Sequence, residues 1–409
     1  MEKAWNFIFD YFFCEKTDLI YDYLVRDCED MAVCHLPSVF EINRQIPNPC
    51  GWGTGMEDSV LSAGTMLDAV VARYNVTGDR NMKISADKIF RGMMRCVVDI
   101  DEGFLARSVS PIDGKSFYYD CSRDQYTHWY YGALRFYNSE LCDERQKQNI
   151  RRVFTAFAKR MERNVVKEND YNFLRYDRKP SIAGKMWGNV GCHEYLRLPF
   201  FYASTWYVTG DEHWYEMYMK YRDEALEKTV KFNAADYGSR CYPVLQMQYS
   251  LRGLYDIDKD SEFKHRCLEF MQSVAKHYAN VSVSESKRIC KLINADENYY
   301  QYKPWNKVRM LYMGIVGDRP YFNPAQSEMR ENSGFYSIRN VGEAVSILAL
   351  CPKFKIKCEQ FEALENLCNA INYDRHCSYA PMLSVCGWWL AREANMVAER
   401  ENKQIQGMS

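Results

Sequence analysis

The stretch Ser59–Asp79, SVLSAGTMLDAVVARYNVTGD, decides the expected fold. Its apolar residues recur at three- and four-residue spacing, which is typical of an α-helix with one face against a core. Gly78 can adopt the left-handed turn that ends a helix, and a Thr or Asp beside it can cap the next one. A second apolar stretch, MKISADKIFRGMMRCVV, follows. The segment therefore predicts a helical hairpin.

The same pattern recurs further along the chain. Residues 198–211 again end in Val-Thr-Gly-Asp, and HWYEMYMKYRDEALEKTV follows. Strand-like alternation is scarce, and no linker rich in Pro, Gly or Ser divides the sequence. A series of this kind is typical of repeated supersecondary units. We expect an all-α fold of helical hairpins in a single domain over residues 1–409.

The overall composition argues against several classes of protein. The 409 residues carry a net charge of -1 with dispersed basic residues, so nucleic acid is not an expected partner. No apolar run approaches a membrane span, and the N-terminus lacks a signal-peptide cleavage pattern. The 16 cysteines show no metal-ligand spacing, which favours a reducing compartment and predicts neither metal nor cofactor. We expect a cytoplasmic protein, or a periplasmic or secreted one if a leader was removed before this numbering.

Several expected hairpins begin with a segment rich in glycine, aromatic and charged residues. These segments read GWGTGMEDSV, CSRDQYTHWYYG, MWGNVGCHEYLRLPFF and YPVLQMQYSLRG. The acids Asp58, Asp124 and Glu194 in the first three lie 66 and 70 residues apart. If successive hairpins pack side by side in a closed ring, these segments gather at one end of it. The sequence therefore predicts a shared polar pocket there.

These motifs resemble those of the six-hairpin glycosidase superfamily. GMEDSVLSAGTMLDAVVARYNVTGD is similar to the first acidic motif of its unsaturated uronyl (glucuronyl and rhamnogalacturonyl) hydrolases, with Asp58 at the acidic position. SRDQYTHWYYGAL resembles the second acidic motif, with Asp124 at that position. The resemblance covers roughly residues 51–350. It implies an (α/α)6 toroid with the active site in a cleft at one end.

The resemblance also implies roles for the two aspartates. In the uronyl hydrolases one aspartate protonates the C4–C5 double bond of the unsaturated sugar and activates water for addition at C5. This implies Asp124 as the acid and base, and Asp58 as the partner that raises its pKa or orients the water. The second motif departs from the family, because paired acids followed by an apolar residue and methionine are replaced by Asp-Gln-Tyr-Thr-His at 124–128. A different reaction on the same toroid therefore stays open.

Other residues of the same segments complete the predicted site. His128, one helical turn after Asp124, and His193 are candidate catalytic histidines. Arginine forks suit a sugar carboxylate, and aromatic rings suit sugar faces. The predicted substrate-binding residues are Trp52, Arg123, Tyr126, Trp129, Tyr130, Trp187, Glu194 and Arg197. The structural alternatives are helix capping for the aspartates, an ion pair of Asp124 with Arg123, an ion pair of Glu194 with Arg197 or with a neighbouring helix, and core packing for the rings.

Three other functions remain compatible with these residues. A polysaccharide lyase would abstract the C5 proton of a uronate with Tyr126, His128 or His193. A sugar 2-epimerase would use paired histidines on a related barrel. A sugar-binding module would not need acids at several hairpin mouths. The sequence favours a glycoside hydrolase that acts on uronate-containing oligosaccharides, with hydrolase and lyase both open.

Overall fold

The computed structural model describes residues 1–25, 36–296, 305–316, 319–325, 328 and 334–407, which are mostly helical. Their α-helices are α1 (Glu2–Tyr11), α2 (Val39–Asn43), α3 (Ser59–Thr77), α4 (Met82–Arg95), α5 (Arg123–Tyr137), α6 (Glu144–Asn164), α7 (Arg197–Thr209), α8 (Glu212–Thr229), α9 (Tyr242–Ile257), α10 (Ser261–Ala295), α12 (Gly334–Leu350), α13 (Cys358–Ala370) and α14 (Pro381–Gly407). Two antiparallel pairs of strands are present, β1 (Phe13–Cys14) with β2 (Leu19–Ile20) and β3 (Met310–Val316) with β4 (Arg319–Pro324). The predicted all-α class is confirmed.

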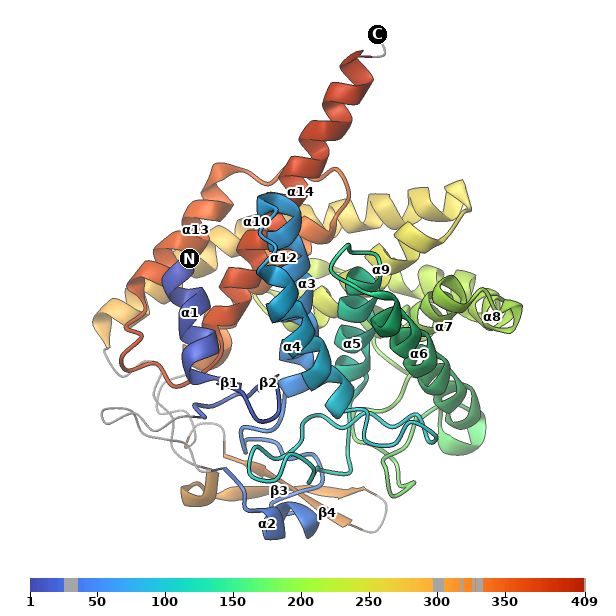
Figure 1. The fold of residues 1–409 in the computed structure, drawn as a ribbon, viewed down its shortest axis with the longest axis vertical. Coiled ribbons are helices and arrows are strands. Elements are labelled where there is room, and N and C mark those ends of the chain that lie inside the picture. Colours follow the sequence, from blue (N-terminus) through green and yellow to red (C-terminus); the bar gives the residue numbers. More distant parts are fainter. Residues whose placement is uncertain (26–35, 297–304, 317–318, 326–327, 329–333, 408–409) are drawn as a thin grey trace.

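The helices form two concentric layers (Figure 1). In the inner layer α3 contacts α5, α5 contacts α7, α7 contacts α9, α9 contacts α12, and α12 contacts α14. Helix α14 contacts α3 and closes the ring. The outer layer contains α1, α4, α6, α8, α10 and α13, each packed against an inner helix. This is the (α/α)6 toroid that the resemblance implies.

The two layers differ in how their sequences distribute apolar residues. The inner helix α3 is buried without a break from Ser59 to Ala72, and small or apolar residues occupy all its faces. The outer helix α6 buries a single stripe that includes Ile150, Phe154 and Phe157, and its charged side chains, apart from the buried Arg160, are exposed or half-buried. A helix that is apolar all round belongs in a core, whereas an amphipathic one covers it. No helix in the described part of the chain combines the length and apolarity needed to cross a bilayer.

The Val-Thr-Gly-Asp turns have the predicted conformation. Gly78 (φ +68°) donates its N–H to the carbonyl of Tyr74 at 2.7 Å, and Gly210 (φ +70°) ends α7 in the same way. Asp211 then caps α8 by accepting the backbone N–H of His213 at 3.1 Å. Each turn therefore reverses the chain from an inner helix to an outer one.

Glycines bring neighbouring inner helices into backbone contact. A Cβ added to Gly64 of α3 would lie 2.3 Å from the carbonyl oxygen of His128 in α5. A Cβ on Gly342 of α12 would lie 2.1 Å from the backbone of Leu383 in α14. Real Cβ atoms do not approach backbone so closely, and the backbone cannot rotate away as a side chain can. These positions therefore fix the diameter of the ring.

The substitution Gly342→Ala is expected to lower the free energy of unfolding by about 3 kcal/mol, because two packed helices must move apart. Gly78→Ala is the matched control, since its φ of +68° is unfavourable for alanine but no atom lies within 4 Å. It should cost only about 1 kcal/mol. Urea denaturation of both variants measures the difference. Equal losses would show that α12 and α14 do not depend on this contact.

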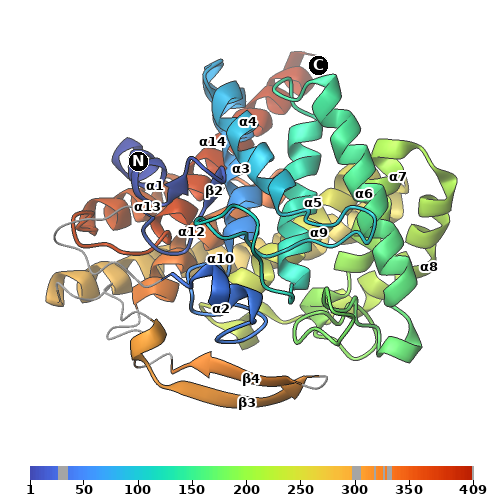
Figure 2. The same ribbon diagram turned by 60° about the horizontal axis from the view of Figure 1, so that its bottom comes forward.

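The β3–β4 hairpin lies at the end of the ring where the inner helices begin, beside α2 (Figure 2). The Asn48 side chain donates to the carbonyl of Phe322 at 2.7 Å, and the hydroxyl of Tyr321 binds Asp120. The ring of Tyr321 also faces Trp52, with centroids 6.2 Å apart. The sequence did not predict this hairpin. It covers part of the end at which the functional residues were expected.

Candidate active site

A cavity of about 840 Å³ opens where the inner helices begin. Its lining residues are Trp52, Glu57, Asp58, Leu61, Arg107, Arg123, Asp124, Ala183, Gly191, His193, Glu194, Arg197, Tyr237, Ser239, Arg240, Tyr242, Pro243, Gln246, Arg339 and Asn340. The segments that were predicted to meet therefore do meet. The cavity contains these predicted residues: Trp52, Asp58, Arg123, Asp124, His193, Glu194 and Arg197. Helix N-termini carry partial positive charge, so this end of the ring favours an anionic ligand.

Asp124 lies in the first turn of α5 and forms an ion pair with Arg197, whose Nη1 is 2.5 Å from Oδ1. Burial opposes ionisation of Asp124, but Arg197 and Arg123 lower its pKa well below the usual range. The carboxyl group therefore remains ionised at neutral pH. A proton donor at neutral pH needs a raised pKa, so this geometry does not support the predicted role of Asp124 as an acid, and the lowered pKa also makes its carboxylate a weak base.

The second ion pair of the cavity joins Arg123 to Glu194. Glu194 also accepts the backbone N–H of Gly191 at 2.9 Å. Asp124 therefore pairs with Arg197 and not with Arg123, and Glu194 pairs with Arg123 of the neighbouring helix α5 and not with Arg197. Both of the arginines predicted to hold a substrate carboxylate already have a carboxylate partner within the protein.

His193 forms a small network with Tyr237 and Glu194. Its Nδ1 is 2.9 Å from the hydroxyl of Tyr237, and its Nε2 is 3.6 Å from Oε1 of Glu194. Burial lowers the pKa of His193 to about 4, although Glu194 opposes this shift. The imidazole is therefore neutral at pH 7. We assign the proton to Nε2, which faces the carboxylate, so Nδ1 accepts from the Tyr237 hydroxyl.

Asp58 occupies the N-cap position of α3. Its Oδ2 accepts from the Tyr379 hydroxyl at 3.2 Å, and its Oδ1 accepts from the Gln125 amide at 3.1 Å. Its backbone N–H donates to Asp22, and burial together with the charges of Asp58 and Glu57 raises the pKa of Asp22 well above its usual value. Asp22 therefore keeps its proton to a higher pH than an ordinary aspartate does. Within the described ranges no group of His, Cys, Asp and Glu residues is placed to hold a metal ion.

Two cations of the cavity lack a close carboxylate partner. Arg107 is 6% exposed, donates to the carbonyl of Glu57 at 3.2 Å, and lies 3.9 Å from the nearest oxygen of Asp58. Its Nε has no hydrogen-bond partner among the described residues, and its guanidinium lies 5.9 Å from the centre of the Trp52 ring. Arg240 is exposed at the rim and forms no ion pair in the described part of the chain. These two side chains are available to an anionic ligand.

Four predicted aromatic contacts lie in the core and do not line the cavity: Tyr126, Trp129, Tyr130 and Trp187. Trp129 donates its indole N–H to a backbone carbonyl of α4, and Tyr130 stacks on Phe201 of α7 with centroids 4.4 Å apart. Tyr126 and Trp187 are also in contact with other rings. The reason is that α5 is buried on all faces, so an aromatic residue near Asp124 in sequence can face a neighbouring helix.

His128 lies behind the cavity wall, where it holds a chain of hydrogen bonds. The Thr65 hydroxyl donates to the carbonyl of Leu61 at 2.9 Å, so the contact of 2.8 Å between Thr65 Oγ1 and His128 Nδ1 requires a proton on Nδ1. The Nε2 of His128 then accepts from the Gln246 amide at 3.5 Å. Gln246 in turn accepts from Arg197 at 2.6 Å. His128 therefore positions Arg197 and does not face the cavity, which departs from its predicted catalytic role.

His128 should also make stability depend on pH. Burial lowers its pKa to about 3, so between about pH 3 and its ordinary pKa of 6.5 the unfolded chain binds a proton that the folded chain does not. Stability therefore falls as the pH falls through this range. His128→Phe removes this term, and its loss of unfolding free energy between pH 7 and pH 4.5 should be smaller than that of the wild type. Urea denaturation at both pH values tests this, and equal losses would contradict a buried neutral His128.

Several residues of the cavity were not predicted from the sequence. Tyr242 and Gln246 lie in the fourth quoted segment, and their spacing of four residues in the first turns of α9 could have indicated them. Tyr237 and Arg240 belong to the irregular stretch before α9, and Arg107 follows α4 in a loop. Irregular segments have no periodicity that shows where their side chains point.

Comparisons with known proteins show similarity at the level of solved structures. No protein-family model matches the chain, and no curated protein matches it. A family 76 glycoside hydrolase (mannosidase) from Bacteroides thetaiotaomicron has a TM-score of 0.49 at 10% identity, over 98% of both chains. A sugar epimerase from a ruminal bacterium has a TM-score of 0.48 at 12% identity, over 98% of both chains. The cellobiose 2-epimerase from Spirochaeta thermophila has a TM-score of 0.45 at 10% identity, over 97% of this chain and 96% of that one. None of the three is described as a uronyl hydrolase, and the identities are too low to carry an activity over to this chain.

Proposed function

We propose that this protein is a glycoside hydrolase that acts on uronate-containing oligosaccharides in the cavity at the N-terminal end of the ring. The observation that supports this most strongly is that Asp58 and Asp124 line one cavity together with Arg107, a buried cation whose ion pair with Asp58 is long, at 3.9 Å. Two carboxyl groups suit glycosidic hydrolysis, and an available guanidinium suits the acidic group of a uronate.

Recognition of the substrate is assigned to Arg107, Arg240 and Trp52. The guanidinium of Arg107 would bind the sugar carboxylate with two parallel hydrogen bonds. Its burial strengthens that interaction, because little water competes for the charge. Trp52 lies beside Arg107 and offers its ring to the apolar face of the same sugar. Arg240, at the rim, would attract a second acidic unit of the chain.

The bond-breaking step is assigned to the two aspartates: Asp124, for which the resemblance implied both the acid and the base role, keeps only the base role, and Asp58 takes the acid role. Asp124, which is ionised, takes a proton from water while the water oxygen attacks the anomeric carbon. The bond from that carbon to the leaving oxygen breaks, and Asp58 gives this oxygen its proton. Asp58 lines the same cavity and accepts hydrogen bonds from Tyr379 and Gln125, which supports its assignment as the second carboxyl of the reaction.

A specific observation also favours a second candidate, β-elimination by a polysaccharide lyase. Tyr237 and His193 form a hydrogen-bonded pair at the cavity wall, and Arg107 could neutralise the uronate carboxylate. The pair would remove the C5 proton, the C4–C5 double bond would form, and the bond from C4 to the leaving oxygen would break as that oxygen takes a proton. A 2-epimerase with paired histidines would need two of them at the cavity. Among the described residues, His193 is the one histidine that lines it, so this reaction has less support.

Turnover of a substrate panel separates these reactions. Saturated and unsaturated uronate oligosaccharides are incubated with the protein, and both reducing sugar and ultraviolet absorbance are followed. Hydrolysis of saturated chains releases reducing sugar without a change in absorbance, and hydrolysis of an unsaturated unit consumes absorbance. Elimination creates absorbance instead. Absence of turnover on every uronate substrate, with turnover on neutral oligosaccharides, would contradict the proposed substrate class.

A further inference from the structure

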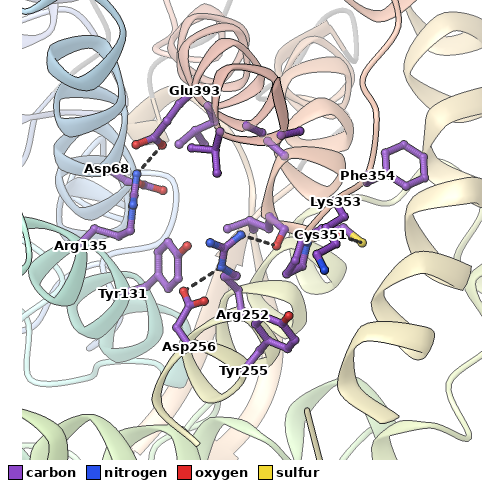
Figure 3. A pocket seen from close by; sticks show the side chains of 17 residues that line it. Asp68, Tyr131, Arg135, Arg252, Tyr255, Asp256, Cys351, Lys353, Phe354 and Glu393 are labelled. Carbon is purple, nitrogen blue, oxygen red and sulfur yellow. Dashed lines mark hydrogen bonds and ion pairs between the residues drawn. The ribbon is translucent and has the colours of Figure 1, made fainter. Parts of the chain in front are cut away.

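A second cavity, of about 230 Å³, lies at the opposite end of the ring (Figure 3). The same inner helices build both ends. Asp68 follows Asp58 by ten residues in α3, and Arg252 follows Tyr242 by ten residues in α9. At 1.5 Å per residue, these pairs are separated by about 15 Å along their helices. The second cavity is therefore distinct from the candidate active site.

Asp68 provides an unused acceptor in this cavity. Its side chain is fully buried, and Oδ1 accepts from Nε of Arg135 at 2.7 Å. Its Oδ2 has no hydrogen-bond partner among the described residues. Burial raises the pKa of Asp68 even though Arg135 opposes that shift. A buried carboxylate oxygen without a donor is costly, so a ligand that donates a hydrogen bond there would be stabilised.

The charges around the cavity balance one another. The charged lining residues are three acids and three bases, Asp68, Asp256, Glu393, Arg135, Arg252 and Lys353. Arg135 joins Asp68 to Glu393, and Arg252 pairs with Asp256 at 2.8 Å. Figure 3 shows both groups facing the same space. A charged ligand that binds the acids or either arginine would have to break one of these pairs, whereas a neutral ligand would not.

The remaining walls combine aromatic and apolar surface. Tyr131 is 4% exposed and points into the space together with Arg252 (Figure 3). Tyr255, Phe354 and Leu390 are among the other lining residues. The volume is below the roughly 300 Å³ at which pockets for drug-sized ligands begin, so the ligand has to be small. We propose that this cavity binds a neutral monosaccharide, whose hydroxyl donates to Asp68 and whose apolar face packs on Tyr131.

Binding of glucose, galactose and mannose to the full chain tests this site, with glucuronate and glucosamine as charged comparisons. Isothermal titration and ligand-observed NMR measure the affinities. Asp68→Asn replaces the free acceptor by an amide donor and should weaken binding by about 10- to 100-fold, the effect of one charge-assisted hydrogen bond. Ala394→Leu fills the cavity from α14 and should abolish binding, whereas its control Ala394→Ser should not.

Two further outcomes decide the proposal. Asp124→Asn, in the other cavity, should leave the affinity for the neutral sugar unchanged, which separates this site from the candidate active site. If Asp68→Asn does not fold, the Ala394 pair gives the answer alone. Three results would overturn the proposal: absence of saturable binding, equal binding by Ala394→Leu and Ala394→Ser, or tighter binding of a charged sugar than of a neutral one.

Discussion

Asp124→Asn is expected to lower kcat on a uronate oligosaccharide by about 1,000-fold at pH 7, within the range that a positioned acid or base contributes. Asparagine keeps the shape of the side chain and can still accept from Arg197, but it cannot take a proton from water. Steady-state kinetics on the substrate identified by the panel give the value. Asp79→Asn, in a surface turn between α3 and α4, is the matched control and should leave kcat unchanged.

Two substrates with different leaving groups can distinguish the roles of the two aspartates. An aryl uronide has a leaving group that needs little protonation, so Asp58→Asn should retain much of its activity on that substrate while losing activity on an oligosaccharide. Asp124→Asn should be impaired on both substrates, because activation of water is still needed. The reverse pattern would return the donor role to Asp124, in spite of its ion pair with Arg197.

Arg107→Met is expected to raise KM for a uronate substrate by about 100-fold, because loss of one partner from a buried charge pair costs about 2–5 kcal/mol. Methionine keeps the apolar contact with Trp52 but removes the guanidinium. The KM for a substrate whose carboxylate has been reduced to an alcohol should change little. Kinetics on this matched pair of substrates measure the contribution of the charge.

Arg107→Lys supplies the control for geometry. Lysine keeps the charge but loses the planar fork that binds a carboxylate with two hydrogen bonds, so its KM should fall between those of the wild type and Arg107→Met. If Arg107→Met raises KM equally for the acidic and the reduced substrate, Arg107 supports the fold of the cavity and does not bind the substrate carboxylate.

One physical pattern in the sequence predicted the fold and the place where the polar segments form a shared cavity. Each inner hairpin begins with a polar segment, and closure of the ring brings the beginnings of the inner helices together. Asp58, Asp124 and His193 line one cavity for this reason, although they are far apart in the sequence. The turns at Gly78 and Gly210 were predictable because their conformation depends on local residues only.

The sequence could not indicate which face of an inner helix lines the cavity. In α5 the residues Gln125–Leu134 are all buried, so hydrophobic periodicity does not separate Asp124 from Tyr130 or Trp129. The sequence also could not indicate the ion-pair partners of the arginines, because Arg197 of α7 pairs with Asp124 of the neighbouring helix α5. Ion pairs between helices depend on how the helices pack, and a local sequence pattern does not indicate this.

The most direct test of this account is the affinity of Asp124→Asn, which should not turn over, for a uronate oligosaccharide and for the same oligosaccharide with its carboxylates reduced. Isothermal titration measures both under identical conditions. The account predicts that the acidic oligosaccharide binds at least tenfold more tightly, and that Arg107→Met in the same background removes most of the difference, with the remainder due to Arg240. Equal affinity for the two oligosaccharides, or a preference of unchanged size without Arg107, would contradict it.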